Sequence, residues 1–241
     1  MAFIGAMERV RADDGPRFLV KGGVSIELRL GLRARATKDV DLVFRGDPPE
    51  MREALEEGLA QPFSGFTFRR KGEVGDIRDT GSRRLLIQLS FGGRDWQTLQ
   101  VEIARPEADE IELVPVAVSI SDFGLEAPEQ VACLSLRYQV AQKLHAVTEQ
   151  PNDRQNLRFW DIVDLLLLEE LLGEDLAPLR DAAVSIFATR GTHAWPPELV
   201  IPASWREPYA RTAGEMDASL PAGIDEAAQR VRQMIRDIAA A

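Results

Sequence analysis

The hydrophobic pattern changes character about halfway along the chain. In the first half, short apolar runs alternate with polar residues and are separated by glycine-containing turns, which predicts strands at 17–20, 39–44, 63–70, 84–91, 97–104 and 111–120. Helices are expected there at 3–11, 24–32 and 49–60. From Pro128 onward apolar residues recur at helical spacing, which predicts helices at 134–146, 158–172, 175–188, from Ser204 as N-cap, and at 224–239.

One of these assignments rests on the flanking glycines rather than on periodicity. Residues 24–32 place apolar side chains at every second position, as a strand would. We assign a helix because Gly22-Gly23 precede the segment and Gly31 lies near its end. The whole pattern predicts an α/β (α+β) fold, with a mixed-sheet core in residues 1–125 followed by an α-helical part in 126–241.

Two carboxylates stand out on the second expected strand. Asp39 and Asp41 are two residues apart, so both point to one face while Val40, Leu42 and Phe44 point to the other. Like charges this close are commonly accommodated by a raised pKa or by a divalent cation. Oxygen ligands at this spacing suit Mg²⁺, which in turn binds a triphosphate. An Asp-x-Asp on a solvated strand is common by itself, so the pair needs a second feature.

The second feature is the glycine pair before the expected helix at 24–32. Gly22 and Gly23 allow a phosphate to approach the backbone, and the helix start offers free N–H groups and the positive end of its dipole. Simple turn chemistry explains a lone Gly-Gly equally well. The turn, the helix start and the carboxylate strand together indicate nucleotidyl transfer.

A third carboxylate is expected near such a pair. Enzymes that use two metal ions need one to bind the second ion or to take the proton of the attacking hydroxyl. Glu102, on the expected strand 97–104, is the candidate if that strand lies beside the Asp strand. The alternative, of equal weight, is that Glu102 simply points outward with Gln100 and Thr98.

Composition excludes several classes of protein. No apolar run is long enough to span a bilayer, and the first residues do not resemble a signal peptide. The single cysteine, Cys133, excludes an internal disulfide, lies in an apolar run and is expected to be a buried thiol in a cytoplasmic protein. Two histidines are too few for most zinc or Ser-His-Asp sites.

Charge is distributed unevenly along the chain. The net charge of −10 argues against nonspecific coating of nucleic acid, but residues 1–105 hold 18 Lys and Arg against 16 Asp and Glu, whereas residues 106–241 hold 11 against 23. A phosphate-bearing ligand is therefore expected to bind the first half. Its densest basic cluster is Arg29, Arg33, Arg35 and Lys38. Residues 69–71 and 83–84 are equally compatible with an RNA-facing patch and with solvated surface.

The same residues resemble a known family. Lys21-Gly22-Gly23, the Arg-Leu-Gly at 29–31 and the segment 34–42 are similar to the signature of AbiEii/AbiGii-type nucleotidyltransferase toxins, within the DNA polymerase β-like nucleotidyltransferase group. In the helical half, Ala141–Ala146 resembles the family's Lys-bearing helix. Residues 156–165 resemble its Arg-x-x-Asp-Leu-x-Asp-Leu element, with Ile162 in place of the first Leu.

The resemblance implies roles for individual residues. Asp39, Asp41 and the candidate Glu102 would hold metal, and Lys143 and Asp161 would join the catalytic set. The nucleotide-binding set would be Lys21, Gly22, Gly23, Thr37, Lys38 and Arg158. An ammonium at Lys143 would neutralise charge on the β- and γ-phosphates as pyrophosphate leaves. Arg158, Asp161 and Asp164 are spaced to line one helix face, where a buried Arg–Asp pairing would hold Lys143 in place. The sequence leaves open which of the two aspartates faces the site.

The implied function is Mg²⁺-dependent transfer of a nucleoside monophosphate from an NTP to an acceptor hydroxyl, with tRNA as the expected acceptor. The family further implies a toxin of a type IV-like toxin–antitoxin system and a cognate antitoxin as partner, with no membrane association. Two alternatives stay open. The same chemistry could act on a small molecule such as an aminoglycoside or on a protein side chain, or the chain could be a non-catalytic member that binds nucleotide or a partner.

Overall fold

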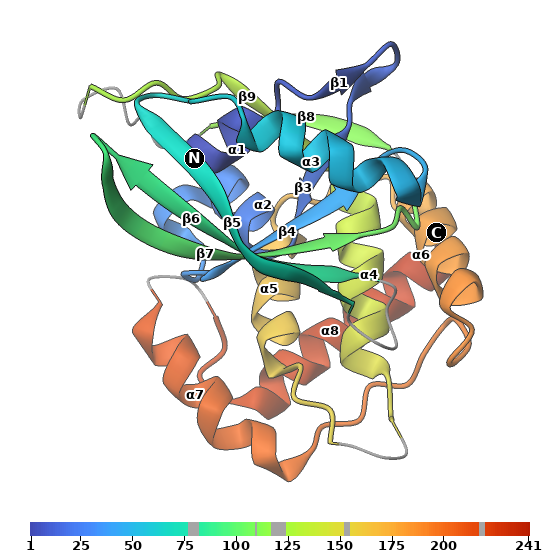
Figure 1. The fold of residues 1–241 in the computed structure, drawn as a ribbon. Coiled ribbons are helices and arrows are strands. Elements are labelled where there is room, and N and C mark those ends of the chain that lie inside the picture. The colour runs from blue at the N-terminus through green and yellow to red at the C-terminus, as the bar shows by residue number, and fades with distance from the viewer. Residues whose placement is uncertain (77–81, 109, 117–123, 152–154, 217–219) are drawn as a thin grey trace. The chain divides into compact units, whose positions relative to one another are not determined.

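The computed structural model describes residues 1–76, 82–108, 110–116, 124–151, 155–216 and 220–241 (Figure 1). These residues form two compact units. Unit 1 comprises Met1–Leu32 and Ala36–Ser135, and unit 2 comprises Arg33–Arg35 and Leu136–Ala241. The sequence places the change at residue 125, ahead of a strand that the structure includes in unit 1. Each unit is described by itself below.

Unit 1 is built on a seven-stranded mixed sheet with the strand order β5-β6-β7-β4-β3-β9-β8. β4 is parallel to β7, β3 is parallel to β9, and the other neighbours are antiparallel. The strands are β3 (Phe18–Lys21), β4 (Asp39–Phe44), β5 (Phe66–Asp76), β6 (Arg83–Phe91), β7 (Arg94–Ala104), β8 (Ile111–Pro115) and β9 (Gln130–Leu134). A separate pair, β1 (Arg11–Ala12) and β2 (Gly15–Pro16), forms a small hairpin. β4 and β7 are neighbours, as the assignment of Glu102 requires.

Helices α1 (Ala2–Met7), α2 (Gly22–Leu30) and α3 (Met51–Leu59) belong to the same unit. Their apolar side chains join the sheet in one core, which contains Phe3 of α1, Leu28 of α2, Leu55 of α3 and the strand residues Leu42 and Ile87. The outer strand β6 buries the alternate side chains Leu85, Ile87 and Leu89 in this core, as the period of two predicts, whereas β3 and β9 bury side chains on both faces. The short helical turns η1 (Gly31–Arg33) and η2 (Pro48–Glu50) end α2 and precede α3.

The helix expected over 24–32 is confirmed as α2, and the alternative strand is wrong. Gly31 ends the helix with φ +60°, a conformation that favours glycine, while Ile26 and Leu28 are buried. Apolar residues at every second position occur in a helix when two of its sides pack against other elements. The glycines on either side, rather than the periodicity, therefore identify this element.

The expectation that the chain is helical from Pro128 onward is wrong at Gln130–Leu134. This segment is β9, paired with β3 on one side and β8 on the other. A short apolar run such as Val131–Leu134 is compatible with either a strand or a buried helix turn, and pairing with two neighbouring strands decides the outcome. Cys133 in this strand is fully buried, and this burial raises the pKa of the thiol to about 11.

Unit 2 is helical and is arranged around α5. The side chains from Asp161 to Leu168 are all buried, and a helix that is covered on every side belongs at the centre of a bundle. α5 (Phe159–Glu169) contacts α4 (Leu136–Thr148), α7 (Arg206–Glu215) and α8 (Ile224–Ala240), while α6 (Ala177–Arg190) packs on α4. The turn η4 (Ala203–Trp205) precedes α7.

Smaller differences concern the ends of elements. The helix expected at 3–11 ends at Met7, and a turn at residues 8–10 leads into β1. Ser204 does not cap a helix; it lies inside η4, and its hydroxyl accepts a hydrogen bond from Gln155. The turn expected to end at Gly81, the end of the strand expected at 111–120 and the helix break at Asn152-Asp153 lie outside the described residues. In the described part of the chain, no helix is long and apolar enough to cross a membrane.

Candidate active site

The two carboxylates that the sequence places on one strand face do lie on β4. Asp39 is exposed and Asp41 is half-buried, whereas Val40, Leu42 and Phe44 between and beyond them are buried in the core. The strand is positioned by those apolar residues, which leave the alternate face for the carboxylates. The hydroxyl of Thr37 donates a hydrogen bond to the backbone oxygen of Asp39, 3.3 Å away, and so orders the approach to the strand.

The glycine pair lies directly against this strand. A Cβ added at Gly22 would be 2.1 Å from Oδ2 of Asp41, and Gly22 also has φ +65°, so both space and backbone conformation require glycine there. A Cβ added at Gly23 would be 2.8 Å from the hydroxyl oxygen of Thr37. The start of α2, the Thr37 hydroxyl and the Asp41 carboxylate are therefore in close contact within unit 1.

The first turn of α2 has the features of an anion site. Lys21 occupies the N-cap position, and its side chain makes no capping hydrogen bond to the helix. Such N–H groups and the positive end of the helix dipole favour a negatively charged ligand. Lys21 is itself the residue paired with Asp41 across β3 and β4. Lys38, the other lysine expected in the nucleotide set, is exposed.

A row of charged residues crosses four neighbouring strands at this level. Lys21 on β3 is opposite Asp41 on β4, Asp41 is opposite Glu102 on β7, and Glu102 is opposite Arg84 on β6. Directly paired residues share a sheet face, so Glu102 lies on the face that carries Asp39 and Asp41. Its carboxylate is also within 3.3 Å of the Arg84 guanidinium. Glu102 thus has both features that the sequence analysis gave as alternatives. It is a neighbour of Asp39 and Asp41, and it points away from the core.

The donor set fits a magnesium ion that the substrate helps to bind. Among the described residues, no three His, Cys, Asp or Glu side chains are grouped closely enough to hold a metal by themselves. Mg²⁺ is commonly bound by one or two carboxylates, with water and substrate phosphates completing the octahedron. Asp39 and Asp41 supply that number, and the contact of Asp41 with Gly22 fixes one of them beside the anion site.

Unit 2 contains the second set of expected site residues. Nζ of Lys143 on α4 donates to Oδ1 of Asp161 at 2.9 Å and to Oδ2 of Asp164 at 2.6 Å, both on α5. Burial would lower the pKa of Lys143, but the charges of the two aspartates outweigh it and raise the pKa above its usual value. Both aspartates therefore contact the lysine, and which of them faces a substrate stays a prediction.

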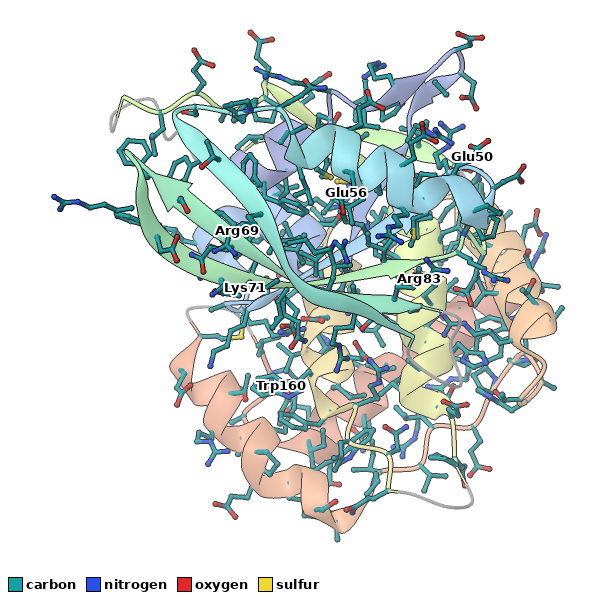
Figure 2. The ribbon with its side chains drawn as sticks, viewed as in Figure 1. Glu50, Glu56, Arg69, Lys71, Arg83 and Trp160 are labelled. Carbon is teal, nitrogen blue, oxygen red and sulfur yellow. The ribbon has the colours of Figure 1, made fainter. Side chains whose placement is uncertain are left out.

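The arginine that completes this network is Arg35. Its guanidinium makes a two-pronged contact with Asp164, with Nε to Oδ1 at 2.8 Å and Nη2 to Oδ2 at 2.9 Å. It also lies 5.4 Å from the ring centre of Trp160, which Figure 2 labels. Burial alone would raise the pKa of Asp164, but Lys143 and Arg35 together hold it below its ordinary value. The sequence pattern proposed an Arg–Asp pairing but did not single out Arg35, because the partners are far apart in the chain.

Arg158, the arginine expected to make that pairing, is mostly exposed. Its Nη1 is 3.7 Å from Oδ2 of Asp161, beyond hydrogen-bond distance, and 66% of its side chain is accessible. Oδ2 of Asp161 is itself buried and accepts no hydrogen bond in the described structure. Arg158 lies at the N-cap of α5, where the chain enters the helix at the surface, which explains why it does not reach the interior.

The basic cluster expected at 29–38 is largely neutralised. Arg29 pairs with Glu112, Arg33 pairs with Glu170, and Arg35 pairs with Asp164. Each guanidinium thus has a carboxylate partner that lies more than 80 positions away in the sequence. Distant carboxylates thus compensate the charge of these three arginines, which local charge density does not report.

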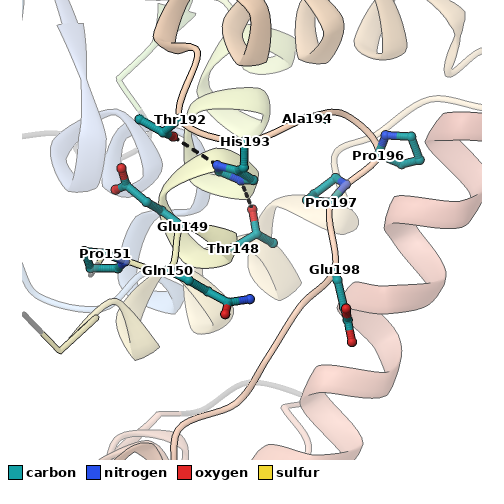
Figure 3. Close-up of a pocket in the computed structure, with 10 residues that line it drawn as sticks. All are labelled: Thr148, Glu149, Gln150, Pro151, Thr192, His193, Ala194, Pro196, Pro197 and Glu198. Atoms are coloured by element: carbon teal, nitrogen blue, oxygen red, sulfur yellow. Dashed lines mark hydrogen bonds between the residues drawn. The ribbon is translucent and has the colours of Figure 1, made fainter. Parts of the chain in front are cut away.

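A cavity of about 660 Å³ in unit 2 lies apart from the expected site residues. Its wall includes His193, whose ring nitrogens contact the hydroxyls of Thr148 at 2.8 Å and Thr192 at 3.0 Å (Figure 3). The Thr192 hydroxyl also contacts the buried ring of His145, which packs on Phe187. His145 is thus a packed core residue, as expected from the sequence. None of the predicted site residues lines this cavity.

Comparison with known proteins identifies a family. The family model for the nucleotidyl transferase AbiEii toxin, of type IV toxin–antitoxin systems, matches residues 5–233. This match covers nearly the whole chain, including β4, α4 and α5. No curated protein is a significant match to the sequence.

One solved structure supports the fold, and two others are more distant. MenT4, the nucleotidyltransferase toxin Rv2826c of Mycobacterium tuberculosis H37Rv, superposes with a TM-score of 0.53 at 20% identity, over 98% of this chain and 89% of that one. A nucleotidyltransferase-like antigen of Paracoccidioides brasiliensis gives 0.44 at 19% identity, over 72% and 80%. The antibiotic-resistance factor ANT(2'')-Ia gives 0.40 at 18% identity, over 78% and 91%. The last two scores are too low to support an assignment, while the first confirms the expected mixed α/β fold.

Proposed function

The chain belongs to the AbiEii family of nucleotidyltransferase toxins of type IV toxin–antitoxin systems, and from this premise we propose that it transfers a nucleoside monophosphate from an NTP to a hydroxyl of tRNA. The acceptor oxygen bonds to the α-phosphorus while the bond from that phosphorus to the β-phosphate oxygen breaks, and pyrophosphate leaves. The family implies an NTP substrate and a cognate antitoxin. The tRNA acceptor, the use of Mg²⁺ and a cytoplasmic location are our proposals.

The contact between Gly22 and Asp41 carries this proposal. It brings a carboxylate of β4 against the uncapped start of α2, so a metal ligand and a phosphate site adjoin. A triphosphate bound at the helix start would present its oxygens beside Asp39 and Asp41. Mg²⁺ held by the two aspartates would supply neutralisation of the phosphate charge and polarisation of the α-phosphate. Gly23, Thr37, Lys21 and Lys38 surround the same turn and are assigned to the nucleotide.

Glu102 is assigned as the third carboxylate. Its register opposite Asp41 gives it the required sheet face, and the Arg84 contact fixes its side chain. In this role it binds a second metal ion or accepts the proton of the attacking hydroxyl. Replacing Glu102 by Gln keeps the shape and removes the charge, whereas replacing Arg84 by Gln removes only the partner. The assignment predicts a larger loss of turnover from the first change than from the second.

Lys143 is assigned to the leaving pyrophosphate. An ammonium group has three N–H donors, and two of them are bound by Asp161 and Asp164. The third donor is available for a phosphate oxygen, and the two aspartates act by positioning the group. Arg158, exposed at the end of α5, is assigned to the nucleotide phosphates. That Lys143 and the two β4 aspartates act on one substrate stays a prediction.

The test is transfer of label. The protein is incubated with Mg²⁺, each α-labelled NTP in turn and total tRNA, in parallel with Asp41→Asn and with Asp181→Asn, an exposed aspartate of α6 that serves as the matched control. We expect label on tRNA from wild type and from Asp181→Asn, and little from Asp41→Asn or after chelation of the metal.

Other outcomes select the alternatives. Label on a small molecule or on protein, with none on tRNA, would show the same chemistry with another acceptor. Nucleotide binding without any transfer, unaffected by Asp41→Asn, would show a non-catalytic member and would overturn the proposal.

A further inference from the structure

The sheet of unit 1 has a polar face on its outer strands. On β6 the residues Leu85, Ile87 and Leu89 are buried in the core, so the alternate residues Arg84, Leu86 and Gln88 lie on the other face. Strand pairing extends this face to Arg69 and Lys71 on β5, and to Thr98 and Gln100 on β7. It continues to Asp39 on β4, which is opposite Gln100. The outer strands thus share one face with the proposed metal site.

Hydrogen bonds confirm that these side chains lie together. Nζ of Lys71 donates to the hydroxyl of Thr98 at 3.1 Å, and this hydroxyl donates to the side-chain oxygen of Gln88 at 2.9 Å. Arg69 is the direct cross-strand neighbour of Gln88. Lys71 therefore extends across β6 towards β7, and the polar groups form a continuous lining from β5 to β7.

The two cations on the polar face of β5 differ in their partners from Arg70, the arginine between them. Arg17, Arg45 and Arg70 are paired with the carboxylates of Glu50, Asp14 and Glu56, respectively. Within the described residues, neither Arg69 nor Lys71 has a carboxylate within ion-pair distance, and both are exposed (Figure 2). Uncompensated cations on the face that carries the catalytic carboxylates are suited to a bound polyanion.

The separation of these groups sets the size of the ligand. From β5 to β4 there are three strand spacings of about 4.8 Å, so the cations and the aspartates are roughly 14 Å apart across the sheet. An acceptor whose hydroxyl is at Asp39 and Asp41 must therefore extend well beyond a single sugar to reach Arg69. Between them, Thr98 is exposed and Gln100 is half-buried, and both are neutral hydrogen-bonding side chains of the kind that contact ribose hydroxyls and base edges. Gln88 beneath them is buried and supports Thr98.

We propose that the polar face of β5, β6 and β7 binds the sugar–phosphate backbone of a polynucleotide acceptor, with phosphates at Arg69 and Lys71 and its reactive hydroxyl at the β4 aspartates. This inference rests on the proposed function and specifies where its acceptor lies. A polynucleotide is favoured over an acidic peptide because it combines regularly spaced anions with the hydroxyl that the reaction consumes.

The test compares adjacent residues of one strand. The double variant Arg69→Gln/Lys71→Gln removes both cations from the polar face, and Arg70→Gln removes a cation that pairs with Glu56. Binding of total tRNA is measured by fluorescence anisotropy at several KCl concentrations without NTP. Each lost phosphate contact lowers the slope of log K against log salt by about 1, so the double variant should lose about 2 while Arg70→Gln keeps the wild-type slope.

One further variant and two control measurements complete the test. Arg69→Lys/Lys71→Arg retains both charges and should bind tRNA within about threefold of wild type, since phosphate contacts require charge rather than a particular side chain. Thermal unfolding and Mg²⁺-dependent binding of a labelled NTP should be unchanged in all variants, because Arg69 and Lys71 are exposed and belong to neither the core nor the nucleotide set.

The outcomes separate this inference from the proposed function. A wild-type slope for the double variant, or competition by polyglutamate as effective as by tRNA, overturns the inference even if wild type labels tRNA. Binding that depends on Arg69 and Lys71 in a protein that transfers no label supports the inference and overturns the proposed function. Absence of measurable tRNA binding by wild type at low salt overturns the inference directly.

Discussion

The two sets of aspartates in this protein are placed in opposite environments. Asp39 and Asp41 lie on a strand of unit 1, one exposed and the other half-buried, beside an uncapped helix start. Asp161 and Asp164 lie on the central helix of unit 2, with side chains that are 8% and 0% exposed. In the first pair, Asp41 lies against Gly22. The second pair is bound by Lys143 and Arg35.

This difference separates a chemical role from a structural one. A carboxylate at the surface costs little to keep ionised and can accept a metal ion or release it. A buried carboxylate must be paired, and losing a partner leaves an uncompensated charge in a medium that solvates it poorly. We therefore expect the β4 pair to govern activity with little effect on stability. The α5 pair should govern stability, and should act on turnover only through the position of Lys143.

The largest effect is expected from Asp41→Asn. The change keeps the shape that packs against Gly22 and removes the charge that would hold Mg²⁺. Loss of several kcal/mol of transition-state stabilisation corresponds to about a 10³-fold lower rate. Stability should change by about 1 kcal/mol or less. Single-turnover transfer and urea unfolding measure the two quantities, and a rate within tenfold of wild type would contradict the role.

Asp164→Asn is expected to have the largest effect on stability. It leaves Lys143 and Arg35 facing a neutral amide inside unit 2. Breaking a buried ion pair from one side typically costs about 3–5 kcal/mol. The control is Asp39→Asn, which should change the free energy of unfolding by no more than about 0.5 kcal/mol, as exposed substitutions do. Equal losses of unfolding free energy for the two variants, measured by urea unfolding, would contradict the expected difference between the β4 and α5 aspartates.

The same network predicts how stability depends on pH. The folded pKa of Asp164 is below its ordinary value of 3.8, so its stabilisation is complete above that value and is lost as pH falls through the lower folded pKa. The pKa of Lys143 is raised above 10.5, so its contribution is complete below that pH and is lost as pH rises through the higher folded value.

The difference in Tm between wild type and Asp164→Asn should therefore be constant from about pH 5 to pH 9 and shrink in stronger acid. Thermal unfolding at a series of pH values measures this difference. A difference that grows as the pH falls would show that the carboxylate is not stabilised by its partners.

The smallest effect is expected from Arg158→Gln. Because the side chain is mostly exposed and 3.7 Å from Asp161, its loss should change the free energy of unfolding by less than about 0.5 kcal/mol. If it binds the nucleotide, KM for the NTP should rise by roughly threefold to tenfold, which corresponds to about 1 kcal/mol, with kcat little changed. Arg180→Gln on α6 is the matched surface control and should leave KM unaltered.

Much of unit 1 follows from local pattern. The period of two places Asp39 and Asp41 together on one face of β4, and the glycines around 22–31 identify α2 against its own alternation. These features depend on residues that are close in the chain, where steric rules act directly. The family signature is carried by the same stretches, which is why the fold class and the family could be recognised from the sequence.

Contacts between residues far apart in the chain determined the other features of the fold and of the candidate site. The sequence alone determined that two acidic residues and a glycine turn exist at suitable spacing; only the tertiary structure set Asp41 against Gly22, Glu102 beside Asp41, and Arg35 on Asp164. Residues 130–134 form a strand because they pair with two neighbouring strands, and the arginines at 29–35 are paired with distant carboxylates. Arg69 and Lys71 have no carboxylate partner among the described residues. Charge and strand pairing depend on which distant groups come within a few ångströms, and the local pattern does not encode that.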